Sequence, residues 1–390
     1  MIHNLVRIFQ IVAVLGCVSS SIYYLLCLWS VRTFLAASKQ SGTADLNQHL
    51  PSISILKPLK GTDPDIYESF RSHCLQDYPD YEIIFGVNDP ADPAIGSVEQ
   101  LQRAFPTRKI QLVVSPVKLG ANVKVSNLAQ MVRAASHEYL VVNDSDIRVE
   151  RDYLRRVVAP LLDNHTGMVT CLYRGVAAPT LGSHLESLGI STDFCPGVLV
   201  ARQLEGGLRF GLGSTLAFRR PDLNRIGGFE SVVDYLADDY ELGRRVASLG
   251  LRVLLSDVVV ETHLPNYGLG GFLAHQMRWA RGVRDSRLGG YVGLASTFGV
   301  MWALVNLIVA HGAAWSWVVL GAILLLRVAM ALAVGKVVLH DRQLSRQVWL
   351  LPVRDLIAVG VWGASFVGHT VTWRGDRFEL KDGRLTRIPS

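Results

Sequence analysis

The chain has 390 residues, of which 49% are hydrophobic and only 18% are charged, and its formal net charge is +6. Soluble domains carry about 25% charged residues, so this composition excludes a disordered or fibrous protein and disfavours a purely soluble one. The five cysteines form no C-x-x-C pair. This pattern argues against both a disulfide framework and a zinc knuckle.

The chain opens with an apolar run over residues 5–30, whose one charged residue is Arg7. About 20 apolar residues are enough to span a bilayer. A signal peptide is the alternative, but no clear cleavage site with a polar mature start follows the run. We therefore expect a retained transmembrane helix, followed by a polar linker of small residues at 38–49.

The C-terminal third, residues 291–373, reads as a membrane region with two or three transmembrane helices. Its apolar runs cover 291–310, 313–334 and 356–372. The second run contains Arg327, which a spanning helix must turn toward other helices. The third run is shorter, and it either spans the membrane or lies re-entrant or interfacial. Three spans would place the basic tail on the face opposite the soluble domain, against the positive-inside tendency.

Between the membrane segments, residues 51–287 alternate short β-rich runs with helical patterns. This alternation predicts an α/β domain with a mostly parallel sheet, in which ligands bind at the carboxyl ends of the strands. No G-x-G-x-x-G follows a predicted strand, and no phosphate loop, H-E-x-x-H or G-x-S-x-G occurs. The predicted strands are 53–56, 81–87, 110–114, 139–142 and 168–172, and the predicted helices are 65–76, 93–104, 123–135 and 151–162.

Two carboxylates, Asp144 and Asp146, follow the predicted strand 139–142. In extended chain, side chains at i and i+2 point the same way. Mg²⁺ favours one or two carboxylates together with phosphate oxygens, so the pair is a candidate metal site. The alternative is a solvated turn before the next helix.

Asp238 and Asp239 open a predicted helix that runs to about residue 249. Acidic residues in a first helical turn are common because they favour the helix dipole. The functional hypothesis is that one of them is a general base, which requires it to lie within hydrogen-bond reach of an acceptor hydroxyl.

A helix over residues 275–281 would place His275, Arg278 and Trp279 on one face. The arginine fork is suited to holding a diphosphate, and the indole would form an apolar wall. A helix lying on the membrane surface is the alternative, and both interpretations are compatible.

The order of these motifs resembles that of the ceramide glucosyltransferases and their bacterial relatives, which include hopanoid-associated glycosyltransferases. The resemblance to this family, glycosyltransferase family 21, covers nearly the whole chain. It implies an inverting, membrane-anchored enzyme of GT-A fold. The motifs are Lys57-Pro58-Leu59-Lys60-Gly61, Asn88-Asp89-Pro90-Ala91-Asp92-Pro93, Asp144-Ser145-Asp146, Ala237-Asp238-Asp239-Tyr240 and Arg278-Trp279.

The resemblance assigns the donor-binding residues by position. Asp92 is expected near the nucleotide base and ribose, and Asp144 near the diphosphate and the metal. Lys57 and Pro58 belong to the first motif at the donor site. Lys124 and Asn127 resemble the lysine and asparagine that help to seat the nucleotide.

The resemblance also assigns the catalytic residues. Asp239 matches the candidate base, with Asp238 beside it, and Arg278 and Trp279 match the closing arginine-tryptophan pair. His275 stands where that motif usually has Gln or Arg. Two departures therefore stand out, because Asp146 completes a D-x-D where eukaryotic ceramide enzymes carry Gly.

The expected function is transfer of a hexose from a UDP-sugar to a lipid hydroxyl, assisted by Mg²⁺ or Mn²⁺, with UDP-glucose and ceramide as the first pair. The catalytic domain is expected to face the cytosol, where sugar nucleotides are made, and no nucleic-acid partner is expected. The alternatives are a hopanoid glycosyltransferase using UDP-N-acetylglucosamine and a bacteriohopane polyol, a processive polysaccharide synthase, a polyprenyl-phosphate sugar transferase, and a non-catalytic membrane scaffold or transporter.

Overall fold

The computed structural model describes residues 2–41, 50–373 and 375–388. Helix α1 (Ile2–Ser41) is longer than the predicted 5–30, and Val6–Lys39 within it is long and apolar enough to cross a membrane. It extends because its second half packs on the catalytic domain, where Thr33 donates a hydrogen bond to Gln203 at 2.7 Å. The predicted linker is therefore helical at 38–41, and its remainder, 42–49, lies outside the described residues.

The catalytic domain is built on an eight-stranded sheet of order β3-β2-β1-β4-β7-β6-β8-β5. Strand β1 pairs in parallel with β2 and β4, β2 with β3, and β6 with β8. The expectation of a mostly parallel sheet is confirmed. The strands are β1 (Ile53–Pro58), β2 (Tyr81–Val87), β3 (Lys109–Val114), β4 (Tyr139–Val142), β5 (Ile147–Arg148), β6 (Thr166–Val176), β7 (Leu216–Arg219) and β8 (Arg252–His263).

Strand β7, which the sequence did not predict, is antiparallel to both β4 and β6 and joins the two parallel parts of the sheet. All residues of β1 and β2 are buried, as expected for parallel strands covered on both faces. The covering helices are α2 (Ile66–Cys74), α3 (Ala94–Ala104), α4 (Val123–Met131), α5 (Tyr153–Val158), α8 (Arg220–Arg225) and α9 (Asp238–Ser248).

The predicted helices match these elements within a few residues, with one informative difference. The predicted helix 151–162 is split into α5 and a 3-10 turn over Ala159–Leu162. Pro160 lies at the start of that turn, and it has no N–H to continue an α-helical ladder.

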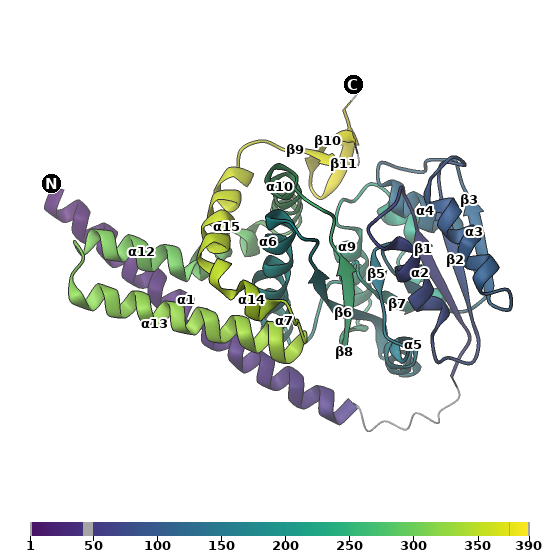
Figure 1. The fold of residues 1–390 in the computed structure, drawn as a ribbon, viewed down its shortest axis with the longest axis horizontal. Coiled ribbons are helices and arrows are strands. Elements are labelled where there is room, and N and C mark those ends of the chain that lie inside the picture. The colour runs from purple at the N-terminus through teal and green to yellow at the C-terminus, as the bar shows by residue number, and fades with distance from the viewer. Residues whose placement is uncertain (1, 42–49, 374, 389–390) are drawn as a thin grey trace.

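Three helices lie between the sheet and the membrane helices: α6 (Leu181–Gly189), α10 (Leu269–Ser286) and α15 (Leu351–Ser365) (Figure 1). A π-turn, Ile190–Phe194, connects α6 to α7 (Cys195–Leu204). These elements therefore form the contact layer through which the catalytic domain meets the membrane region.

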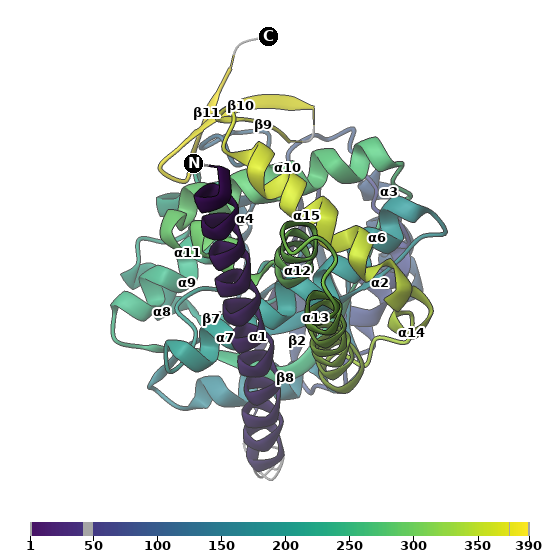
Figure 2. The ribbon, with the colours of Figure 1, turned by 90° about the vertical axis from the view of Figure 1, so that its left-hand side faces the viewer.

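Helices α1, α12 (Gly299–Val309) and α13 (Ala314–Leu332) pack side by side and form what we call the membrane bundle (Figure 2). Among the described residues, three helices are long and apolar enough to cross a membrane, or four if a bent pair counts as one span. The bent pair corresponds to the predicted run 291–310. It consists of Leu288–Thr297 and Gly299–Val309, which meet at an angle of 51°.

The third predicted run, 356–372, is wrong at its C-terminal end. Helix α15 ends at Ser365, and the chain continues into a small antiparallel sheet of β9 (Thr370–Trp373), β10 (Asp376–Lys381) and β11 (Arg384–Arg387). The backbone of this sheet pairs with the segment before α9, since Leu236 N–H donates to Gly383 O at 3.0 Å. The tail thus returns to the catalytic domain (Figure 1).

Candidate active site

A cleft of about 1500 Å³ runs from the carboxyl ends of β1 and β4 to the membrane bundle. Its sheet end is lined by the loops that carry the predicted carboxylates, including Asp144 and Asp239. Its membrane end is lined by Tyr24 of α1, Arg327 of α13 and Asp355 of α15. The cleft therefore connects the edge where α/β proteins bind ligands with the helices expected in the bilayer.

The carboxylates of Asp144 and Asp238 meet at one lysine. Lys124 Nζ lies 2.7 Å from Asp144 Oδ1 and 3.5 Å from Asp238 Oδ2. Burial alone would lower the pKa of Lys124, but the surrounding charges of Asp144, Asp238 and Asp239 raise it. The lysine is therefore a fixed positive charge at the centre of the acidic group.

Gly213, in the turn before β7, marks the point where the acidic group converges. Its backbone N–H donates to Asp239 Oδ2 at 2.7 Å. A Cβ added at Gly213 would lie 3.1 Å from Asp144 Oδ2, 3.3 Å from Asp239 Oδ2 and 3.6 Å from Lys124 Nζ. Only a residue without a side chain lets these groups approach so closely.

The carboxyl group of Asp239 has an unusually high proton affinity. Burial, followed by the charge of Asp238, raises its pKa to about 6, although Lys124 opposes the shift. Burial also raises the pKa of Asp238, whose Oδ1 accepts a hydrogen bond from Asn122 at 3.2 Å. At neutral pH Asp239 is mostly ionised and still basic enough to accept a proton, as a general base requires.

The D-x-D pair lies in the turn between β4 and β5. Lys57, fully buried beneath it, donates to the backbone carbonyl of Asp144 at 2.9 Å. Burial lowers the pKa of Lys57 to about 7, against the attraction of Asp146 and Asp144. Asp146 accepts a hydrogen bond from Thr262, and burial together with the charge of Asp144 raises its pKa to about 6.

This pair fits a divalent cation only in part. Within the described residues, no group of three or more His, Cys, Asp or Glu side chains is arranged to hold a metal ion. Two repelling carboxylates at the cleft supply the part of a Mg²⁺ shell that proteins usually contribute, the rest coming from phosphate oxygens and water. Asp144 is 38% exposed, so it is accessible to such a cation.

The predicted face of α10 is confirmed, because His275, Arg278 and Trp279 all line the cleft. The Arg278 guanidinium lies 5.9 Å from the ring centre of Trp373 in β9. Trp279 packs edge-on against Phe194 with ring centres 5.6 Å apart.

On the same face, His275 stacks on Tyr267 and lies 3.2 Å from Glu186 Oε1. Further along α10, Arg281 and Arg284 donate to backbone carbonyls of the segment that follows α15. Those two arginines therefore anchor that segment, whereas the motif residues face the cleft.

Two predicted donor-site residues do not reach the cleft wall. The Asp92 carboxylate accepts hydrogen bonds from the N–H groups of Gly61, at 2.9 Å, and Ala94, also at 2.9 Å. Asn127 is buried and donates to Gly86 O at 2.8 Å. Asp92 thus holds the loop that carries Lys60 to the cleft, and Asn127 holds the end of β2. Lys57 also lies behind the wall, whereas Pro58 lies in it.

Three cleft residues escaped the sequence analysis: Tyr173, Glu186 and Asp193. Burial raises the pKa of the Tyr173 phenol well above its usual value, and the carboxylates of Asp239 and Glu186 add to the shift. Glu186 is 3% exposed and accepts a hydrogen bond from Gln276 at 2.8 Å. An acidic residue within an otherwise apolar helical stretch was the available signal for Glu186.

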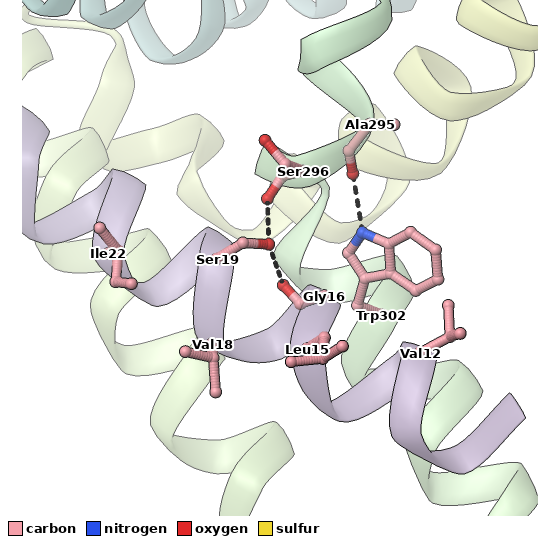
Figure 3. Close-up of a pocket in the computed structure, with 9 residues that line it drawn as sticks. All are labelled: Val12, Leu15, Gly16, Val18, Ser19, Ile22, Ala295, Ser296 and Trp302. Atoms are coloured by element: carbon pink, nitrogen blue, oxygen red, sulfur yellow. Dashed lines mark hydrogen bonds between the residues drawn. The ribbon is translucent and has the colours of Figure 1, made fainter. Parts of the chain in front are cut away.

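A second, apolar cavity of about 470 Å³ opens on α1, next to the membrane end of the cleft (Figure 3). Ser19 donates both to Gly16 O and to Ser296 O at 3.0 Å, which holds α1 against the helix break. Trp302 closes one side, and its indole N–H donates to Ala295 O at 2.7 Å.

The arrangement of sheet, acidic turn and helix α10 defines a glycosyltransferase of GT-A type. The mannosyltransferase PcManGT of Pyrobaculum calidifontis, solved in complex with GDP-Man and Mn²⁺, shares the fold with a TM-score of 0.51 and 18% identity. The similarity covers 91% of this chain and 99% of that one.

The sequence profile of glycosyl transferase family 21 matches residues 12–386, and the chain belongs to this family. It is 25% identical to ceramide glucosyltransferase 1 of Caenorhabditis elegans over 250 residues, 64% of this chain and 53% of that protein. It is 22% identical to a ceramide glucosyltransferase of Pyricularia oryzae over 440 residues, 88% of this chain and 87% of that protein. The chain spans about half the length of the first curated relatives it matches.

Proposed function

We propose that the protein is an inverting membrane glycosyltransferase that moves a hexose from a UDP-sugar to a lipid hydroxyl, with UDP-glucose and ceramide as the first substrates to test. One observation carries this proposal. Asp239, Asp144 and Lys124 converge at Gly213 in a cleft that continues to the membrane bundle. The family of the chain and the nucleotide sugar bound by PcManGT support it.

In this mechanism Asp239 removes the proton from the acceptor hydroxyl. The Gly213 N–H holds Asp239 Oδ2 in place, so the carboxylate is oriented before substrate arrives. The acceptor oxygen then attacks the anomeric carbon on the face opposite the leaving UDP, which inverts its configuration.

The charge that develops on the departing diphosphate must be stabilised. Arg278 and Lys124 are the cations of the cleft wall nearest to the catalytic motifs, and preorganised charges of this kind are an effective source of transition-state stabilisation. Asp144 and Asp146 are the residues that would hold Mg²⁺ or Mn²⁺, which neutralises diphosphate charge when bound. Trp279 would close the apolar side of the pocket.

The tail constrains the membrane topology in this proposal. Because β11 pairs with the segment before α9, the tail and the catalytic domain lie on one side of the membrane. An even number of crossings must separate them, so α12 and α13 form a hairpin and α15 does not cross. Both faces would then be cytosolic, in agreement with the positive-inside tendency of the tail.

The experiment uses the full chain in phosphatidylcholine nanodiscs with UDP-glucose and ceramide. UDP release and mass spectrometry of the lipid product report transfer, and UDP-N-acetylglucosamine with a bacteriohopane polyol is the second donor and acceptor pair. Asp239→Asn should keep UDP-sugar affinity within about twofold and lower transfer by about 10²- to 10⁴-fold, the usual contribution of a general base. Wild-type transfer by Asp239→Asn would exclude Asp239 as the base.

A further inference from the structure

A chain of buried charged side chains lies at the membrane end of the cleft. Arg327 of α13 donates to Asp355 of α15 at 2.6 Å and to Asp193 of the π-turn at 2.7 Å. Arg354, also in α15, lies 3.3 Å from Asp193 and donates to Gln276 at 2.8 Å. Ionisable residues in apolar helices are costly to maintain and usually mark a functional site.

The chain continues to the catalytic motif. Gln276 of α10 donates to Glu186 of α6 at 2.8 Å, and the same carboxylate lies 3.2 Å from His275. Phe194, adjacent to Asp193, packs against Trp279. A group bound at Asp193 would therefore lie beside the residues expected to surround the donor.

This charged chain keeps unused hydrogen-bonding capacity. Arg354 is 5% exposed, and its Nε and Nη1 atoms are buried without a hydrogen-bond partner among the described residues. Asp193 Oδ2 is likewise buried and accepts no hydrogen bond from those residues. Because buried polar groups are nearly always hydrogen-bonded, a bound molecule is the natural partner for these atoms.

We propose that this end of the cleft binds the uncharged polar headgroup of the acceptor lipid, with Arg354 donating to a headgroup oxygen and Asp193 accepting from a headgroup hydroxyl or amide. The inference rests on the proposed function and names the acceptor site within it.

The charges of the site favour a neutral headgroup over a phosphate. Three carboxylates and two guanidinium groups line it, so the formal balance is minus one, and both arginines are already paired with carboxylates. A phosphate would add negative charge beside those carboxylates. Hydroxyl and amide groups both donate and accept, which matches the free atoms on each side. The residues are Glu186, Asp193, Asp355, Arg327 and Arg354.

The surroundings are suited to the lipid tails. The apolar cavity on α1 includes Ile22 and Ser296, and the cleft begins at the adjacent residues Tyr23 and Thr297 (Figure 3). The two cavities therefore meet where α1 crosses the helix break. Hydrocarbon chains in the cavity would leave the headgroup free to enter the cleft.

The test measures acceptor and donor KM separately in phosphatidylcholine nanodiscs, with UDP-glucose and UDP-N-acetylglucosamine as donors. The acceptor probes are short-chain ceramide, a bacteriohopane polyol and polyprenyl phosphate. Arg354→Lys keeps the positive charge and removes the planar guanidinium donors. We expect the acceptor KM to rise about tenfold while the UDP-sugar KM stays within about twofold, because only headgroup contacts are lost.

A second variant displaces the guanidinium without replacing it. A Cβ at Gly189 would lie 2.5 Å from Arg354 Nη2 and 2.6 Å from Nε, so Gly189→Ala should shift the flexible arginine end and raise the acceptor KM in the same way. Arg346→Lys, an exposed arginine before α15, is the matched control and should leave both KM values unchanged.

An unchanged acceptor KM in both variants, or an equal rise of donor and acceptor KM, would overturn the acceptor-site inference. A wild-type preference for polyprenyl phosphate would overturn the neutral headgroup. Failure of the proposed function is distinguishable from these results, because the wild-type protein would then transfer sugar from neither donor to any probe.

Discussion

Asp239 accepts a hydrogen bond from the backbone N–H of Gly213 at 2.7 Å, which joins the first turn of α9 to the turn before β7. The contact fixes the candidate base against a strand that runs opposite to its neighbours. The position of the carboxylate is therefore determined by the sheet and does not depend on the flexibility of a loop.

Gly213→Ala should lower transfer by about 10- to 100-fold, because the added methyl group would press on the carboxylates of Asp144 and Asp239 and misplace them. The measurement is kcat/KM for UDP release with lipid acceptor. Gly96→Ala is the control, since Gly96 lies exposed in α3 with nothing within 4 Å of its added Cβ. Equal activity of the two variants would contradict the close approach at Gly213.

The pH dependence of transfer should show an acidic limb set by Asp239. A general base must be ionised, and burial raises its pKa to about 6, so kcat/KM should rise with pH through that value and level off above it. A profile that stays flat between about pH 5 and 7 would argue that a group with an ordinary carboxyl pKa performs the step.

Trp373→Leu should raise the UDP-sugar KM by about 2- to 10-fold, because it removes the ring over which the Arg278 guanidinium lies. The acceptor KM should change less, since the tail contacts only the donor motif. Trp349→Leu, at a residue that is 70% exposed, is the control. An unaltered donor KM in Trp373→Leu would show that the tail does not position Arg278.

Asp355→Leu should destabilise the protein by about 3 kcal/mol, because it leaves Arg327 buried with one carboxylate partner fewer. The double variant Arg327→Met/Asp355→Leu should regain much of that stability, since apolar residues can replace a buried pair. Thermal unfolding in detergent measures both.

Arg387→Met is the control for this pair, because it breaks an exposed ion pair with Asp376 that is worth about 0–1 kcal/mol. A double variant less stable than Asp355→Leu alone would show that Arg327 is required by its remaining contacts.

Local patterns were sufficient to predict the parallel half of the sheet. The bounds of β2 and β4 agree with the predicted strands 81–87 and 139–142, because continuous apolar runs between helices have few other folds available. The carboxylates after β4 and the face of α10 were likewise found from spacing. Strand β7 was missed because it pairs antiparallel with strands far away in the chain, and its four residues carry little periodicity of their own.

The sequence by itself determined the family, the membrane helices and the residues that carry the chemistry, since motif order, apolar length and side-chain type are local properties. Only the tertiary structure decided which of these residues share a cleft. Asp92 and Asn127 were expected at the donor site, yet they hydrogen-bond backbone groups behind it, whereas Asp193, Glu186 and Arg354 meet there from separate helices. The physical reason is that long-range packing selects the partners of buried polar groups, and no sequence interval records that selection.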